Sequence, residues 1–341
     1  MNKILITGGA GYIGSHTAII LIEQGYEIVI VDNLSNSKIS VFERIKKITG
    51  IMPKYKIFDI TDKQKLLDFF NTNAINSIIH FAAYKAVGES VEQPLKYYKN
   101  NLLGLINLLE CCVEYNVENF VFSSSCTVYG QPDILPVTEK TTVGKMESPY
   151  GNTKLISEQI LKDFINSGKT LKITALRYFN PIGAHPTGII GELPTGIPNN
   201  LVPYITQTAI GIREELKIFG NDYDTPDGTC IRDFIDVNDL ALAHLDAIKY
   251  LQKIETDSHY DFFNVGTGNG VSVKQLVDLF INSTGINLKH KYTDRRAGDV
   301  AKIWADTTLA NIKLGWKAQT PLNETLMNAW KWEKYLRDLR V

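Results

Sequence analysis

Short runs of β-branched and aliphatic residues alternate with longer amphipathic stretches through the first half of the chain. Each short run fits a strand buried on both faces, and each longer stretch repeats its apolar positions at helical spacing. This alternation predicts an α/β fold, a doubly wound parallel sheet with helices on both faces. The predicted strands are 3–7, 28–31, 56–58, 77–80, 119–123 and 172–176, and the predicted helices are 15–25, 62–73, 94–115 and 148–166.

The pattern changes near residue 180. Residues 181–203 are rich in Pro and Gly, which is typical of an ordered surface loop. Beyond this loop, strand and helix signals mix without a clear topology. The sequence therefore predicts a first domain over 1–180 and a smaller mixed α/β domain over 181–341, interleaved with the first. The elements expected in the second part are helices 201–212, 237–250, 273–284 and 322–336 and strands 216–219 and 262–265.

Composition excludes several classes of partner. The 341 residues are 44% hydrophobic and 21% charged, and the formal net charge is −1. A balanced charge does not attract nucleic acid or a membrane surface, and no apolar run approaches the length of a signal core or a membrane span. The four cysteines have no metal-ligand spacing, and the adjacent Cys111 and Cys112 are a poor disulfide pair. We expect a cytoplasmic protein with no metal, nucleic-acid or membrane partner.

Three glycines follow the first predicted strand at three-residue spacing. Gly8, Gly11 and Gly14 lead into a helix, and the next strand ends on Asp32, eighteen residues past Gly14. Glycines allow a sharp turn and a close approach to a pyrophosphate, which the helix N-terminus also attracts. A carboxylate after the second strand can accept hydrogen bonds from ribose hydroxyls and repels a 2′-phosphate. This arrangement predicts a Rossmann-type site for NAD rather than NADP, although three glycines alone would be a weak signal.

A second candidate site is the stretch 148–154, SPYGNTK. Ser148 can cap a helix with Pro149 at its first position, which places Tyr150 and Lys154 on one helix face. At about 5 Å and an effective dielectric of about 20, the lysine charge would favour the phenolate by roughly 3 kcal/mol, or about two pKa units. Tyr150 could then approach neutrality and act as a general base. The spacing by itself also occurs on surface helices, but the strand-end serines Ser124 and Ser125 strengthen the interpretation.

Taken together, these residues resemble the extended short-chain dehydrogenase/reductase family, and within it the UDP-galactose (UDP-glucose) 4-epimerases. The match runs from residue 4 to past residue 300. The matching pieces are GGAGYIGSHT, VDNLSNS, HFAAYKAVGESV, FSSSCTVYG, SPYGNTK, LRYFNPIGAHP, GIPNNLVPYI, IFGNDYDTPDGTCIRDFIDV and residues 296–304.

The resemblance implies an isomerase that interconverts UDP-galactose and UDP-glucose through a 4-keto sugar and tightly held NAD. Tyr150 would take the proton of the sugar 4-hydroxyl, Ser125 would align the hydrogen bond, and Lys154 would lower the Tyr150 pKa and hold the nicotinamide ribose. The implied cofactor residues are Gly8, Gly11, Tyr12, Ile13, Gly14, Asp32, Asn33, Asp59, Ile60, Phe81, Ala82, Lys85, Asn100, Tyr150, Lys154 and Phe179. The implied UDP-sugar residues are Ser125, Asn180, Asn200, Leu201, Phe219, Arg232, Arg296, Asp299 and Ile303.

The chain departs from the family pattern at a few positions. Ala83 and Cys126 replace small residues, and Phe234 replaces a tyrosine. Ile303 matters most, because Tyr at this position goes with glucose-type sugars and a smaller residue goes with N-acetylated ones. The resemblance therefore leaves open an additional or main activity on UDP-N-acetylglucosamine.

Three other functions occur on, or are compatible with, the same fold. A nucleotide-sugar 4,6-dehydratase needs an Asp-Glu pair where this chain has Cys126 and Thr127. A net dehydrogenase would release NADH, and a non-catalytic NAD sensor would not need Ser125, Tyr150 and Lys154 together. The resemblance also implies a homodimer through the helices predicted over 94–115 and 150–166.

Overall fold

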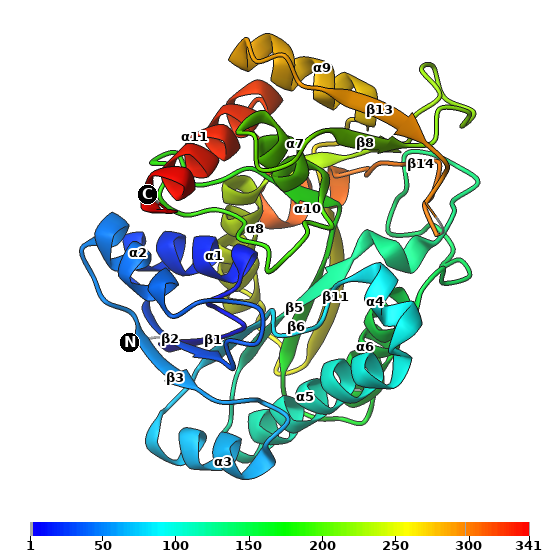
Figure 1. Ribbon diagram of the computed structural model, residues 1–341. Coiled ribbons are helices and arrows are strands. Elements are labelled where there is room, and N and C mark those ends of the chain that lie inside the picture. Colours follow the sequence, from blue (N-terminus) through cyan, green and yellow to red (C-terminus); the bar gives the residue numbers. More distant parts are fainter. Residues whose placement is uncertain (1–2, 297, 341) are drawn as a thin grey trace.

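The computed structural model describes residues 3–296 and 298–340 (Figure 1). Its centre is a seven-stranded sheet in the order β11-β6-β5-β4-β1-β2-β3, and all of its strand pairs are parallel. The predicted doubly wound parallel sheet is confirmed. Its strands are β1 (Lys3–Thr7), β2 (Glu27–Asp32), β3 (Lys54–Ile57), β4 (Ser77–His80), β5 (Asn119–Ser125), β6 (Lys172–Tyr178) and β11 (His259–Val265).

Strand β11 comes from the second half of the chain and closes one edge of this sheet. It pairs with β6 over its whole length, from His259 beside Lys172 to Val265 beside Tyr178. The sequence predicts a strand at 262–265 but does not place it, because the residues of a buried strand do not identify the strand that pairs with it. Helix α8 (Val237–Gln252) precedes β11 and packs against α1 (Tyr12–Glu23). Both α8 and β11 therefore pack against elements formed by the first half of the chain.

Helices cover the two faces of the sheet (Figure 1). Helices α1, α2 (Ser40–Thr49), α8 and α10 (Thr308–Leu314) bury one apolar core against alternate residues of β1 and β2, such as Ile4 and Ile30. Helices α3 (Lys63–Thr72), α5 (Pro94–Glu114) and α6 (Pro149–Asn166) bury a second core against the opposite face, with Leu5 and Val29. Because successive strand residues point to opposite faces, every strand of this sheet except the exposed edge strand β3 supplies residues to both cores.

Several elements differ from the sequence prediction. Helix α1 begins at Tyr12 and not near Ser15, so Gly14 lies inside its first turn. Helix α2 was not predicted, although Val41, Phe42 and Ile45 are buried at helical spacing and Gly50 ends the helix in the left-handed conformation. The short helices α4 (Val87–Glu92) and α10 were also not predicted.

The remaining elements form a smaller layer beyond the carboxyl ends of the main strands (Figure 1). Its core packs α7, α9 and α11 around β8, and β8 pairs with β13. Among the described residues, no helix is both long and apolar enough to cross a membrane. The bounds are α7 (Leu201–Ala209), α9 (Val273–Thr284), α11 (Leu322–Arg340), β7 (Asn180–Ile182), β8 (Leu216–Phe219), β9 (Ile231–Arg232), β10 (Phe234–Asp236), β12 (Val271–Ser272), β13 (His290–Thr293) and β14 (Lys302–Ile303).

Candidate active site

The glycine turn between β1 and α1 is packed too tightly for side chains. Gly8 has φ +71°, and a Cβ on it would lie 2.7 Å from the Ala82 amide nitrogen. A Cβ on Gly14 would lie 2.5 Å from the Gly8 carbonyl oxygen. Gly11 occupies the N-cap position and has no side chain to cap α1, which starts with Tyr12 and Ile13. The turn therefore leaves bare backbone in front of a helix N-terminus, as an anionic ligand requires.

Asp32 lies at the end of β2, beside this turn. Its Oδ2 accepts from the Ala10 amide at 3.0 Å, and its Oδ1 accepts from the Leu34 amide at 2.8 Å and from Ser37 Oγ at 3.0 Å. These bonds fix the carboxylate at the edge of the glycine turn. An ionised carboxylate has about four acceptor sites, so Asp32 can still accept from a ribose hydroxyl.

Some of the other predicted cofactor residues lie at the carboxyl ends of the strands, as the glycine turn and Asp32 do. Phe81 and Ala82 follow β4 directly, and Phe179 is buried immediately after β6. Asn33 donates to Asp59 at 2.9 Å beyond β2 and β3. Ile60 is buried, Lys85 forms an ion pair with Glu192, and Asn100 donates to Asn101 within α5.

The three predicted catalytic residues come from β5 and the first turns of α6. Ser125 ends β5, and Ser148 Oγ caps α6 by accepting from the Gly151 amide at 3.2 Å, as the sequence predicts. Tyr150 is the second residue of α6, and the Ser125 side chain is close enough to lower its pKa. Lys154 lies one turn later and donates from Nζ to the Ser123 carbonyl at 2.5 Å. The carboxyl end of β5 thus lies next to the side chains of both Tyr150 and Lys154.

The charge state of this group differs from the sequence expectation. Burial raises the pKa of Tyr150 to about 12, and the hydrogen bond with Ser125 offsets part of this rise. Burial lowers the pKa of Lys154 to about 7, against a smaller opposing effect of Glu158. The expectation that Lys154 brings the Tyr150 pKa towards neutrality is not met, because burial raises that pKa and Lys154 is not among the groups that lower it.

A buried ionic network lies behind Lys154 and was not predicted. Arg177 of β6 meets Glu158 of α6 with Nε–Oε1 at 2.9 Å and Nη2–Oε2 at 2.6 Å. Ser124 Oγ donates to Glu158 Oε1 at 2.5 Å, and Arg177 Nη1 donates to the Tyr129 hydroxyl at 2.9 Å. Both charged side chains are buried. The sequence shows that Glu158 lies one turn of α6 after Lys154. It does not show that Glu158 pairs with Arg177, which is nineteen residues away.

Several predicted UDP-sugar residues meet at the far end of the site. Asp299 Oδ1 accepts from Arg296 at 2.8 Å and lies 3.7 Å from Arg232 Nη2. The Arg296 guanidinium lies 5.9 Å from the centre of the Phe219 ring, which is exposed. Two cations and an exposed aromatic ring thus share one surface, which suits a nucleotide with a pyrophosphate.

The remaining predicted substrate residues line the approach from β7 and α7. The Asn180 side-chain oxygen is buried and has no hydrogen-bond partner among the described residues, so it is available to a ligand donor. Asn200 and Leu201 begin α7, and Asn200 donates to Glu192 at 2.6 Å. Ile303 is buried in one cluster with Cys126 and Phe179, next to the strand end that carries Ser125.

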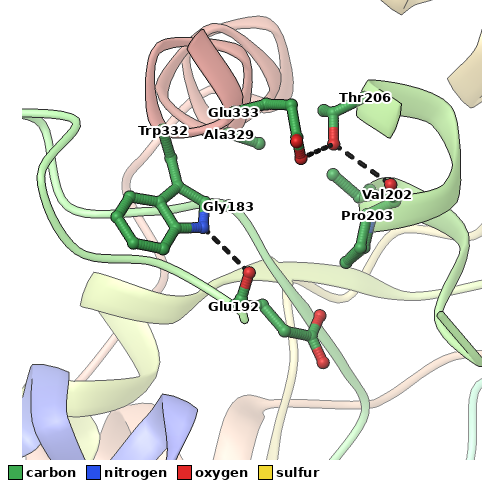
Figure 2. A pocket seen from close by; sticks show the side chains of 8 residues that line it. All are labelled: Gly183, Glu192, Val202, Pro203, Thr206, Ala329, Trp332 and Glu333. Carbon is green, nitrogen blue, oxygen red and sulfur yellow. Dashed lines mark hydrogen bonds between the residues drawn. The ribbon is translucent and has the colours of Figure 1, made fainter. Parts of the chain in front are cut away.

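A narrow pocket lies beside this site, between α7, α11 and the loop after β7 (Figure 2). None of its eight lining residues is Ser125, Tyr150 or Lys154. One of them, Glu192, contacts two predicted ligand residues, and the sequence reasoning missed it because the 181–203 loop showed only a Pro and Gly signal. The lining residues are Gly183, Glu192, Val202, Pro203, Thr206, Ala329, Trp332 and Glu333.

Known proteins resemble the chain over nearly its full length. The family model described as GDP-mannose 4,6 dehydratase matches residues 5–329. A UDP-glucose 4-epimerase of Yersinia enterocolitica is 50% identical over 332 residues, which make up 97% of this chain and 97% of that protein. The solved UDP-glucose 4-epimerase of Stenotrophomonas maltophila, with bound NAD and formylated UDP-arabinopyranose, has a TM-score of 0.95 at 45% identity and covers 99% of this chain and 100% of its own. The Bifidobacterium longum enzyme, with NAD+ and UDP, has a TM-score of 0.94 at 42% identity and covers 99% of both chains.

Proposed function

The chain belongs to the UDP-glucose 4-epimerase family of the extended short-chain dehydrogenases/reductases, and we propose that it interconverts UDP-galactose and UDP-glucose with Tyr150 as the catalytic base. It is an NAD-dependent isomerase. The observation that carries the assignment of the base is the placement of Tyr150 beside Ser125, with Lys154 one helical turn away and bonded to the Ser123 carbonyl. This group lies at the carboxyl ends of the strands, where ligands bind in doubly wound sheets.

The residues around the glycine turn fit NAD. A Cβ at Gly8 or Gly14 would collide with backbone. The amides of Gly8, Ala10 and Gly11 donate within the chain, so a pyrophosphate would meet the first amides of α1, which starts at Tyr12. Asp32 is fixed where a ribose diol would meet it, and a 2′-phosphate would be repelled. NAD, when bound, would supply the acceptor and donor of the C4 hydride and the positive charge of an oxidised nicotinamide.

Residues of the chain transfer the proton of the sugar 4-hydroxyl. Tyr150 takes the proton of the 4-hydroxyl as C4 is oxidised, and Ser125, which lies beside Tyr150, would hydrogen-bond to the same sugar 4-oxygen. Because burial raises the Tyr150 pKa, the base needs a nearby positive charge, which protonated Lys154 supplies in part. The 4-keto sugar then turns over and regains its hydrogen on the other face, and Tyr150 returns the proton to the 4-oxygen.

The substrate side of the proposal rests on the cations and on Asn180. Arg232 and Arg296 would bind the pyrophosphate, and Asp299 would accept from the ribose. The unpartnered oxygen of Asn180 would accept from a sugar hydroxyl. Asn200, Leu201, Phe219 and Ile303 complete the proposed set. We place the division between the NAD-binding and UDP-sugar-binding parts near residue 180, with α8 and β11 returning to the first part.

A dimer and a cytoplasmic location belong to the same proposal. Helix α5 packs against α6 and leaves Leu95, Ile106 and Val113 exposed. Their spacings of eleven and seven residues place them on one helix face, which suits a second copy of the chain. Cys111, Cys112, Cys126 and Cys230 are all free, which supports the reducing cytoplasm as the location.

Dehydration is the reaction that the family model's description suggests instead. It requires an acid and a base beside the strand-end hydroxyl to remove water across C5 and C6. Cys126 and Thr127 occupy those places, and burial raises the pKa of the Cys126 thiol to about 12. A neutral thiol and a hydroxyl do not provide that acid–base pair.

Isotope retention tests the proposed reaction. UDP-galactose carrying deuterium at C4 should give UDP-glucose with the deuterium still at C4, because the hydride is returned to the same carbon. The product is examined by mass spectrometry and proton NMR. Loss of the label to solvent, or formation of a 6-deoxy-4-keto sugar, would contradict the proposal.

A further inference from the structure

The Glu192 carboxylate joins two residues from opposite sides of the site. Its Oε1 accepts from Lys85 Nζ at 3.2 Å and from Asn200 Nδ2 at 2.6 Å. Lys85 belongs to the loop after β4, whose Ala82 touches the glycine turn, and Asn200 precedes the first residue of α7. One oxygen atom therefore connects the cofactor side of the fold with the substrate side.

At Asn200, the hydrogen bond to Glu192 replaces the usual side-chain cap of a helix. It occupies the N-cap position of α7, where an Asn side chain usually accepts from the amides of the first turn. Here the side chain donates to Glu192 and makes no capping bond to α7. The helix thus gives up a cap so that the amide can point towards the site.

The backbone holds Glu192 firmly. Trp332 of α11 donates from its indole nitrogen to the Glu192 carbonyl at 2.8 Å, and in Figure 2 the Glu192 side chain extends away from that helix. A Cβ on Gly191 would lie 2.6 Å from the Trp332 ring, so the loop packs directly on the indole. The Arg44 guanidinium of α2 lies 4.9 Å from the centre of the same ring. These contacts fix the loop between both parts of the fold.

The carboxylate leaves both partners able to bind ligands. A lysine ammonium has three donors and an asparagine amide has two, so each keeps at least one hydrogen after bonding to Glu192. The side chain of Glu192 is only 11% exposed, and water therefore competes weakly for its charge. Glu192 can orient the remaining donors without being a ligand itself.

We propose that Glu192 is a positioning residue that orients Lys85 towards the cofactor and Asn200 towards the UDP-sugar, and so couples the binding of the two. This inference rests on the proposed function, which assigns Lys85 and Asn200 to those ligands. It accounts for a largely buried acid that bonds to one predicted cofactor residue and to one predicted substrate residue. Coupling follows because a change at one partner frees the shared carboxylate and loosens the other.

The test is a set of variants with two separate measurements. Glu192→Gln keeps the shape of the side chain but removes its charge, and it should raise both the rate of NAD loss during dialysis and the KM for UDP-galactose by about tenfold, while kcat changes little. Glu214→Gln, an exposed acid in the same half of the chain, is the matched control and should change neither. A purely structural role would lower the amount of active enzyme without this split between KM and kcat.

The partners give a second route that does not depend on the folding of the Glu192 variant. Lys85→Met should raise the KM for UDP-galactose, and Asn200→Ala should speed NAD loss, each by several-fold and each across the site. Effects confined to the near ligand, or unchanged values in Glu192→Gln, would overturn the inference. A wild-type enzyme that retains NAD but does not epimerise would refute the proposed function instead, so the two failures are distinguishable.

Discussion

Replacement of Arg177 by Met should destabilise the protein severely. Arg177 and Glu158 are 4% and 7% exposed, and their two bonds are 2.9 and 2.6 Å long. Removal of the arginine leaves the Glu158 carboxylate buried with Ser124 as its remaining bonded partner. Breaking one side of a buried pair costs about 3–5 kcal/mol, which is a large share of the roughly 5–15 kcal/mol that stabilises a typical protein. The loss of the guanidinium from above Phe262, 4.1 Å away, adds to the effect.

Thermal unfolding of the NAD-loaded protein measures this prediction. We expect the midpoint of Arg177→Met to fall by roughly 5–10 °C. The control is Arg337→Met, which removes an exposed ion pair with Asp338 and should cost at most about 1 kcal/mol. The double variant Arg177→Met/Glu158→Leu removes both charges and should be more stable than Arg177→Met alone. The reasoning is refuted if Arg177→Met behaves like the control, or if the double variant is the less stable of the two.

Four further predictions follow from the site and the cores. Tyr150→Phe should lower kcat by about 10²- to 10⁴-fold with NAD still bound, and a variant with full turnover would disprove its role as base. Gly14→Ala should lose NAD on dialysis, because its Cβ would lie 2.5 Å from the Gly8 carbonyl, and normal NAD content would contradict the glycine argument. Ile303→Tyr should lower kcat/KM for UDP-N-acetylglucosamine more than for UDP-galactose, because a larger side chain fills the same buried position; equal effects would rule out a gate. Burial lowers the pKa of three histidines to about 3 or 4. Below pH 6.5 the unfolded state therefore binds more protons than the folded state. These three residues should lower the free energy of unfolding by up to about 4 kcal/mol for each pH unit of acidification between pH 6 and 4. Urea unfolding at a series of pH values measures this slope, and an unchanged slope in a His80→Asn variant would count against it. These histidines are His16, His80 and His244.

Local signals in the sequence account for most of the first half of the fold. The strands and the helices α3, α5 and α6 were predicted because their apolar spacing and caps are contained in short stretches. Ser148, for example, caps α6 as expected. Helix α2 was missed although its apolar positions carry the same signal, and α1 begins earlier than expected because a glycine in its first turn resembles the end of a loop.

Long-range pairings could not be predicted from such signals. Strand β11 joins β6 across more than eighty residues, and nothing in either strand names its partner. The same holds for Arg177 with Glu158 and for Glu192 with Lys85, since a charged residue does not reveal which opposite charge it will meet. The sequence also misjudged Tyr150, because desolvation depends on packing that only the fold supplies.

Proton NMR of the purified protein with UDP-galactose, and with no NAD added, tests the central claim most directly. The account predicts that signals of UDP-glucose appear and reach a stable mixture with those of UDP-galactose, because the enzyme retains its own NAD. A parallel tube with UDP-N-acetylgalactosamine shows whether N-acetylated sugars are accepted. If neither tube forms an epimer, even after NAD is supplied, the protein is not a UDP-sugar 4-epimerase and the assignment of Tyr150 loses its basis.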